Sequence, residues 1–200
     1  MKKLIVGIGG VTNGGKTTLS RSLQERLPNS CVISQDNFFK DNSVVPVDHN
    51  GFKQYDVLSA LHMDRMMSAI EDWLRDPQTF MTSHGLPVTH PVSPRKQDKD
   101  VFILIVEGFL IFNYAPLNSL IRKRYFLDVP YEVSKERRSS RVYSPPDPPG
   151  YFDGHVWPMY LKNREEMESM VKDMVFLDGT LDKEELVSTV YEEVMAEVER

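Results

Sequence analysis

The stretch LIVGIGGVTNGGKTT, residues 4–18, decides the fold. Within it, residues 10–17 match the pattern G-x-x-x-x-G-K-[ST] at every fixed position. An apolar run of strand length, Leu4–Ile8, precedes the match, and a run with helical character, Thr18–Leu27, follows it. A strand, a glycine-rich loop and a helix in this order predict a P-loop that binds nucleoside triphosphates.

Each part of this loop has an expected task. Consecutive backbone N–H groups turn toward the phosphates, while Lys16 reaches the β- and γ-phosphates and the Thr17 hydroxyl ligates Mg²⁺. A glycine-rich turn that binds nothing would need neither the lysine nor the hydroxyl. The candidate ATP-binding residues of the loop are Gly10, Val11, Thr12, Asn13, Gly14, Gly15, Lys16, Thr17 and Thr18.

Further apolar runs of strand length alternate with helical stretches, which predicts an α/β fold of the P-loop NTPase type. We expect one domain over residues 1–200, with a five-stranded parallel sheet and helices on both faces. The clearest helical pattern predicts a helix over Leu58–Leu74, with an apolar core face. The other strands are predicted at Cys31–Ser34, Val101–Val106, Tyr125–Val129 and Met174–Leu177.

Composition limits the classes of partner and compartment. A net charge of −5 without a long basic block favours neither nucleic-acid nor anionic-membrane binding. The glycines after Leu4–Ile8 shorten the apolar run below that of a signal peptide, and no segment has membrane-helix length. The only cysteine, Cys31, indicates a buried small side chain in a reducing compartment, so we expect a cytoplasmic protein.

Two acids follow predicted strands and so border the expected phosphate site. Asp36 can accept the proton of an attacking hydroxyl and contact Mg²⁺, unless it merely caps a turn. Glu107 resembles a Walker B acid that holds a metal-bound water, with a solvent-facing strand end as the alternative. The candidate metal-side residues are therefore Thr17, Asp36 and Glu107.

The acceptor side of the site is predicted around Asp36. Of the adjacent Phe38 and Phe39, core residues by default, Phe39 is favoured to stack on a planar base. Asp56 either caps the helix at Leu58 or accepts hydrogen bonds from ribose hydroxyls, with Tyr55 beside the base. Asn37 and Phe38 are also candidate substrate-binding residues.

An arginine-rich helix, Tyr131–Arg141, precedes a proline-rich run within Ser144–Gly154. Arg137 and Arg141 are four residues apart and share a helix face, whereas Arg138 points about 100° away. We expect the first two to face the donor phosphates and Arg138 the acceptor, in a lid segment over residues 131–154. A solvated basic helix face is the alternative. The region Pro77–Asp100 is predicted to be a surface excursion without chemistry.

Several of these stretches together resemble the nicotinamide riboside kinases, and the likeness covers nearly the whole chain. The Walker A loop alone is widespread, but its combination with residues 150–160, GYFDGHVWPMY, is specific. The glycine pairs of the P-loop look closest to the muscle-type vertebrate form. The stretches are residues 10–18, 35–40, 54–56, 107–110, 137–143 and 150–160.

The resemblance implies phosphorylation of nicotinamide riboside to nicotinamide mononucleotide in NAD salvage, with ATP or else GTP as donor, and a fold similar to uridine and adenylate kinases. It implies catalytic roles for Lys16, Asp36 and Arg138. The implied nucleoside pocket comprises Phe39, Tyr55, Asp56, Arg138, Tyr143 and Ser144. The implied ATP lid comprises Arg137, Arg141, Val142 and Tyr143.

Other functions stay open at this point. Asn37 stands where the family often has a second acid, and a uridine- or cytidine-type kinase would use the same machinery. The Pro145–Pro149 run has P-x-x-P spacing, and muscle-type relatives are associated with integrin binding, so a binding module is an alternative of another class. A switch GTPase is not supported, because no Asn-Lys-x-Asp occurs. Oligomeric state and the range of acceptors do not follow from the sequence.

Overall fold

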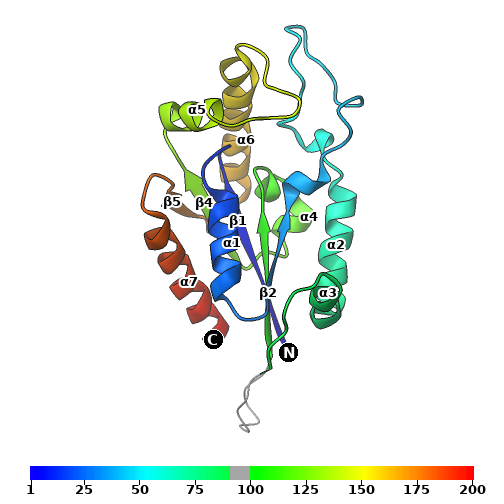
Figure 1. Ribbon diagram of the computed structural model, residues 1–200, viewed down its shortest axis with the longest axis vertical. Helices are drawn as coiled ribbons and strands as arrows, with labels where there is room; N and C mark the ends of the chain where they lie inside the picture. The colour runs from blue at the N-terminus through cyan, green and yellow to red at the C-terminus, as the bar shows by residue number, and fades with distance from the viewer. Residues whose placement is uncertain (91–99) are drawn as a thin grey trace.

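The computed structural model describes residues 1–90 and 100–200 as an α/β fold around one parallel sheet. Its strand order is β2-β3-β1-β4-β5 (Figure 1). All neighbouring strands pair in parallel, so their carboxyl ends meet at one edge, as predicted. The strands are β1 Lys2–Gly10, β2 Ser30–Ser34, β3 Val101–Glu107, β4 Lys123–Asp128 and β5 Val175–Asp178.

Helices cover both faces of the sheet, which confirms the predicted layering (Figure 1). On one face, Leu4 and Val6 of β1 pack with the apolar sides of α1 and α7. On the other face, Ile5 packs with residues of α2, α3, α4 and α6. The helices are α1 Lys16–Arg26, α2 Met63–Arg75, α3 Pro77–Ser83, α4 Ala115–Asn118, α5 Tyr131–Ser139, α6 Trp157–Met170 and α7 Lys183–Glu199.

The predicted helix over Leu58–Leu74 begins later than expected. A short 3-10 turn at Leu58–Ala60 precedes α2, whose N-cap position is His62. Between this turn and α2, the backbone bonds to the segment after β2: the His62 N–H donates to the Phe38 carbonyl at 2.7 Å. Asp56 is therefore not the cap of this helix. The apolar face is confirmed as core, with Met66, Ile70 and Trp73 fully buried. The prediction that Cys31 is buried is also confirmed.

Part of the predicted surface excursion Pro77–Asp100 is a helix. Asp76 caps α3 by accepting the Thr79 N–H at 3.1 Å, and Pro77 occupies its first turn. An Asp-Pro pair is a helix-start signal, since proline needs no partner for its missing N–H there. Pro77 and Met81 are buried, so the segment contributes to the core. The portion at 91–99 lies outside the described residues.

The predicted arginine helix is shorter than expected. α5 ends at Ser139, and Arg141 follows in a turn. The Arg141 N–H donates to the Arg138 carbonyl at 3.1 Å. Arg137 and Arg141 therefore do not share one helix face, and this part of the prediction is wrong. Across residues 1–90 and 100–200, no helix combines the length and apolar character needed to cross a bilayer.

Candidate active site

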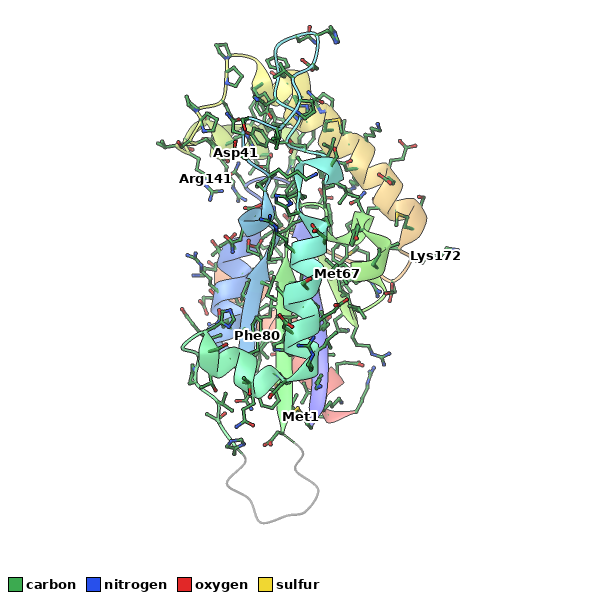
Figure 2. All side chains as sticks on the ribbon, turned by 90° about the vertical axis from the view of Figure 1, so that its right-hand side faces the viewer. Met1, Asp41, Met67, Phe80, Arg141 and Lys172 are labelled. Atoms are coloured by element: carbon green, nitrogen blue, oxygen red, sulfur yellow. The ribbon has the colours of Figure 1, made fainter. Side chains whose placement is uncertain are left out.

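A cavity of about 1020 Å³ opens at the carboxyl edge of the sheet. The P-loop forms its floor, and segments after β2, before α2 and around α5 and α6 form its walls. Figure 2 places Asp41 and Arg141, from two of these walls, at the same end of the molecule, away from Met1. Lining residues as far apart in the sequence as Lys40 and Arg141 thus face one space.

The P-loop has the backbone shape that its glycines predict. Gly15 has φ +97° and Asn13 has φ +58°, both in the left-handed region. At Gly10, an added Cβ would lie 2.5 Å from the Leu127 carbonyl oxygen of β4, so the loop passes against the neighbouring strand without room for a side chain. Gly10 is thus the residue at which β1 ends and the chain turns into the P-loop that leads to α1.

Lys16 and Thr17 begin α1 and line the cavity. The Lys16 ammonium donates to the Val11 carbonyl at 2.9 Å, so it folds back over the loop. Desolvation lowers the pKa of Lys16, and the nearby Glu107 and Asp36 carboxylates act in the opposite direction. A cation held here without full hydration is suited to receive phosphate oxygens.

Glu107 ends β3 beside β2, where it is paired in register with Ser34. It is only 1% exposed, which excludes the alternative of a solvent-facing strand end. The Thr17 hydroxyl donates to its Oε1 at 3.3 Å, and the Ser34 hydroxyl donates to the same oxygen. Asp36, in the turn after β2, lines the cavity and lies close enough to Lys16 to act on its charge.

The oxygen ligands at this edge fit Mg²⁺. Thr17 and Glu107 are in contact, and Asp36 follows the adjacent strand. In the described parts of the chain, no group of three or more His, Cys, Asp or Glu could hold a metal alone. Mg²⁺ is commonly held by one or two carboxylates with substrate phosphates and water, so this set suits an ion that arrives with a nucleotide.

Aromatic rings and one acid form another wall of the cavity. The Phe39 ring lies 5.7 Å from Tyr55 edge-to-face and 5.7 Å from Phe109 in a stacked arrangement. Asp56 lines the cavity next to Tyr55, and its Oδ2 lies 3.0 Å from Nε2 of His155. This wall offers flat apolar surface beside a hydrogen-bond acceptor.

The lid segment lies against the P-loop. Nη1 of Arg137 donates to the Asn13 carbonyl at 3.2 Å, and Nη1 of Arg141 donates to the Asn13 side-chain oxygen at 2.9 Å. The Ser134 hydroxyl donates to the Thr12 carbonyl at 3.0 Å. Arg137 and Arg141 therefore share a loop neighbour, although a turn and not one helix face brings them together.

Arg138 has a different set of partners. It donates to both carboxylate oxygens of Asp147, at 2.6 and 3.0 Å, and to the Thr12 hydroxyl at 2.9 Å. Its guanidinium lies over the ring of Tyr143 at 4.5 Å and that of Tyr151 at 5.8 Å. The alternative of a solvated basic face does not describe Arg138, whose side chain is 12% exposed.

The structure brings most of the predicted site residues to this cavity, though not all of them. Four predicted residues, Gly14, Asn37, Phe38 and Glu107, are missing from the described residues that line it. Phe38 packs against the core, and Glu107 lies behind the lining residue Thr17, with which it is in contact. Val142 lines the rim and is 97% exposed. The proline run contributes to the cavity wall with Ser144, Pro145, Pro146, Asp147 and Pro148.

Several lining residues escaped prediction because their positions depend on tertiary packing. Phe109 follows β3, and Asp147 lies within the proline run. The aromatic segment 150–160 stands out from the sequence only by its likeness to a family. The lining residues missed in this region are Tyr151, Val156, Tyr160, Asn163, Arg164 and Met167.

Comparisons with known proteins agree with this arrangement. The family described as "AAA domain" matches residues 6–158. Nicotinamide riboside kinase 1 of Mus musculus is 56% identical over 200 residues, covering 100% of this chain and 98% of the relative. Nicotinamide riboside kinase 2 of Homo sapiens is 53% identical over 192 residues, covering 96% of this chain and 81% of the relative. These two identities do not single out one vertebrate form.

A solved structure shows the same fold at low sequence identity. The structure of a possible uridine kinase from Bacillus stearothermophilus superposes with a TM-score of 0.53 and 18% identity. The superposition covers 89% of this chain and 90% of the other. At this identity the likeness concerns the fold alone.

Proposed function

Because this chain belongs to the nicotinamide riboside kinases and carries the matched AAA domain, we propose that it phosphorylates the ribose 5′-hydroxyl of nicotinamide riboside. The product is nicotinamide mononucleotide, an NAD precursor, and the donor is ATP. One observation supports this proposal most strongly. The P-loop with Lys16, the Asp36 carboxylate and the Phe39 and Tyr55 rings all line a single cavity.

The donor triphosphate is proposed to bind along the P-loop. Backbone N–H groups surround its β-phosphate, and Lys16 contacts the β- and γ-phosphates. Arg137 and Arg141, which already bond to Asn13, lie beside this loop and can stabilise charge on the transferred group. Thr17, Asp36 and Glu107 would hold Mg²⁺, which neutralises phosphate charge when bound.

The acceptor is proposed to bind against the aromatic wall. Phe39 and Tyr55 contact the planar base, while Asp56 accepts hydrogen bonds from ribose hydroxyls. Arg138 and Tyr143 approach from the lid segment, at the position where Arg138 bridges Thr12 and Asp147. The positively charged pyridinium ring of the substrate is suited to a pocket of aromatic faces.

Phosphoryl transfer then requires little covalent chemistry from the protein. The 5′-oxygen forms a bond to the γ-phosphorus, and the bond from that phosphorus to the bridging oxygen of ADP breaks. Asp36 accepts the proton of the 5′-hydroxyl and later releases it to solvent. Because the cavity is lined by the lid segment, water is excluded when both substrates are bound.

A substrate panel tests the proposal. The purified chain is incubated with ATP and Mg²⁺ and with nicotinamide riboside, uridine, cytidine or adenosine, and products are identified by mass. We expect one nicotinamide mononucleotide for each ADP formed, and a higher kcat/KM for nicotinamide riboside than for the other nucleosides. A preference for uridine or cytidine would assign the chain to the other nucleoside class. Exchanging ATP for GTP in the same assay determines the donor.

A further inference from the structure

Three atoms of Asp56 lie close to residues of α6 and of the turn that precedes it. The Asn163 side-chain N–H donates to its carbonyl at 2.9 Å, its own N–H lies 3.4 Å from Nε2 of His155, and its Oδ2 lies 3.0 Å from the same nitrogen. A residue in a turn outside any helix or strand has few local bonds that fix its side chain. Here distant residues determine its orientation.

His155 is a buried polar residue that none of the proposed catalytic steps uses. It is 3% exposed and lies beside Tyr151, with the ring centroids 5.1 Å apart. One nitrogen cannot both donate to the Asp56 carboxylate and accept from the Asp56 N–H. The shorter distance belongs to the carboxylate, so Nε2 carries the proton and donates to Oδ2.

An unusual helix turn presents His155 to Asp56. Phe152–Val156 form a π-helical turn in which the Trp157 N–H bonds to the Phe152 carbonyl. Pro158 follows, and because proline has no N–H it cannot bond to the Gly154 carbonyl, which favours the wider turn. The extra residue in this turn changes the direction of the side chains that follow it.

The same turn packs closely against the chain that carries Asp56. We define the acceptor hairpin as residues 41–56, closed by the bridge between Val47 and Lys53. Its Phe52 ring lies so near Gly154 that an added Cβ would be 2.4 Å from Cε2. The Tyr151 hydroxyl donates to the Lys53 carbonyl at 2.6 Å. In Figure 1 the hairpin, in cyan and blue, runs beside the yellow start of α6.

From these contacts we infer that His155 is a positioning residue, which orients the Asp56 carboxylate to receive the ribose hydroxyls of the acceptor. The inference rests on the proposed function and deepens it. A carboxylate held by one N–H keeps its second oxygen available and loses less rotational freedom on binding. His155 thereby raises the affinity for the nucleoside without contacting it.

Steady-state kinetics of His155 variants test this role. His155→Phe keeps the ring volume and removes the donor, whereas His155→Gln places a side-chain N–H near the original Nε2. We expect His155→Phe to raise KM for nicotinamide riboside about tenfold, with KM for ATP and kcat within about twofold of wild type. His155→Gln should stay within about threefold. His84→Phe, a matched change at the end of α3, should leave all constants unchanged.

A double-mutant cycle shows whether the effect passes through Asp56. In the Asp56→Asn background, adding His155→Phe should change KM for the nucleoside less than about twofold. A full tenfold effect in that background would overturn the inference. So would a lowered unfolding temperature with unchanged KM, which is the pattern of a merely structural residue. If His155→Phe does not fold, the smaller His155→Leu takes its place.

The assay also separates this inference from the proposed function. If the wild-type chain phosphorylates nicotinamide riboside and His155→Phe keeps the wild-type KM, only the positioning role is wrong. If another nucleoside is the acceptor, the same cycle is measured with it. If the wild-type chain phosphorylates no nucleoside, both fail together.

Discussion

Arg138 and Asp147 form a two-pronged ion pair, with Nε 2.6 Å from Oδ2 and Nη2 3.0 Å from Oδ1. The pair joins α5 to the proline run across the cavity wall, and it leaves Nη1 of Arg138 on the Thr12 hydroxyl. A bidentate guanidinium–carboxylate pair fixes the plane of the arginine. Arg138 is therefore oriented before any ligand arrives.

This ion pair leads to a prediction about Asp147. In Asp147→Ala the guanidinium loses two of its partners and must be ordered by the nucleoside itself. We expect KM for nicotinamide riboside to rise about fivefold and kcat to change less than about twofold. Initial rates with the nucleoside varied at saturating ATP measure both constants. A lower KM would instead mean that Asp147 competes with the acceptor for Arg138.

The arginines of the lid segment should differ in their kinetic effects. Arg138→Ala should mainly raise KM for the nucleoside, because it binds the acceptor similarly in ground and transition states. Arg141→Ala should mainly lower kcat, because charge on the transferred phosphoryl group develops in the transition state. Each substrate is varied separately. The assignment is wrong if both variants give the same pattern, or if Arg138→Ala weakens ATP alone.

Lys16→Ala should abolish nearly all turnover while the fold remains intact. The ammonium that folds over the P-loop is the charge proposed to contact the β- and γ-phosphates directly, so we expect a loss of at least about 100-fold. Product formation and far-UV circular dichroism are measured together. Lys172→Ala, on an exposed residue after α6, is the matched control. Near-wild-type rates in Lys16→Ala would refute the donor assignment.

Asp36→Asn should lower kcat and leave triphosphate binding less affected. Loss of general-base action alone typically costs ~10²–10⁴-fold. Single-turnover rates and the affinity for a nonhydrolysable ATP analogue separate the two effects. A variant that kept more than about a tenth of the rate would place the base elsewhere, or show that none is needed.

Cys31 provides a pH-dependent prediction about stability. Burial raises the pKa of its thiol to about 12, above the ordinary value for an unfolded chain. At alkaline pH the folded state therefore keeps a proton that the unfolded state loses. The contribution of Cys31 to the free energy of unfolding is fully present below about pH 8.5 and declines as the pH rises toward 12. Between pH 8 and pH 10, wild type should lose about 1–2 kcal/mol more unfolding free energy than Cys31→Ala. Equal losses in denaturant titrations would contradict it.

The amino-acid sequence by itself determined the strands, the P-loop and the layer architecture. These follow from local patterns: apolar runs such as Val101–Val106 form buried strands, and the glycines of the P-loop permit its backbone angles. The identity of Lys16, Thr17 and Asp36 as cavity residues also followed, since residues after parallel strands gather at one edge. Local chemistry and the rules of parallel sheets were sufficient for these predictions.

Tertiary structure alone decided the partners of the acceptor wall. The sequence left Asp56 either as a helix cap or as a ribose-binding residue, because a local pattern carries no information about His155, which lies 99 residues further along. Likewise, the helix expected from Leu58 begins at Met63. The His62 N–H donates to the Phe38 carbonyl and so makes no bond within a helix. Backbone and side-chain groups bond to whichever partners the packed chain brings near, and those long-range partners fix the site where local propensity leaves several conformations open.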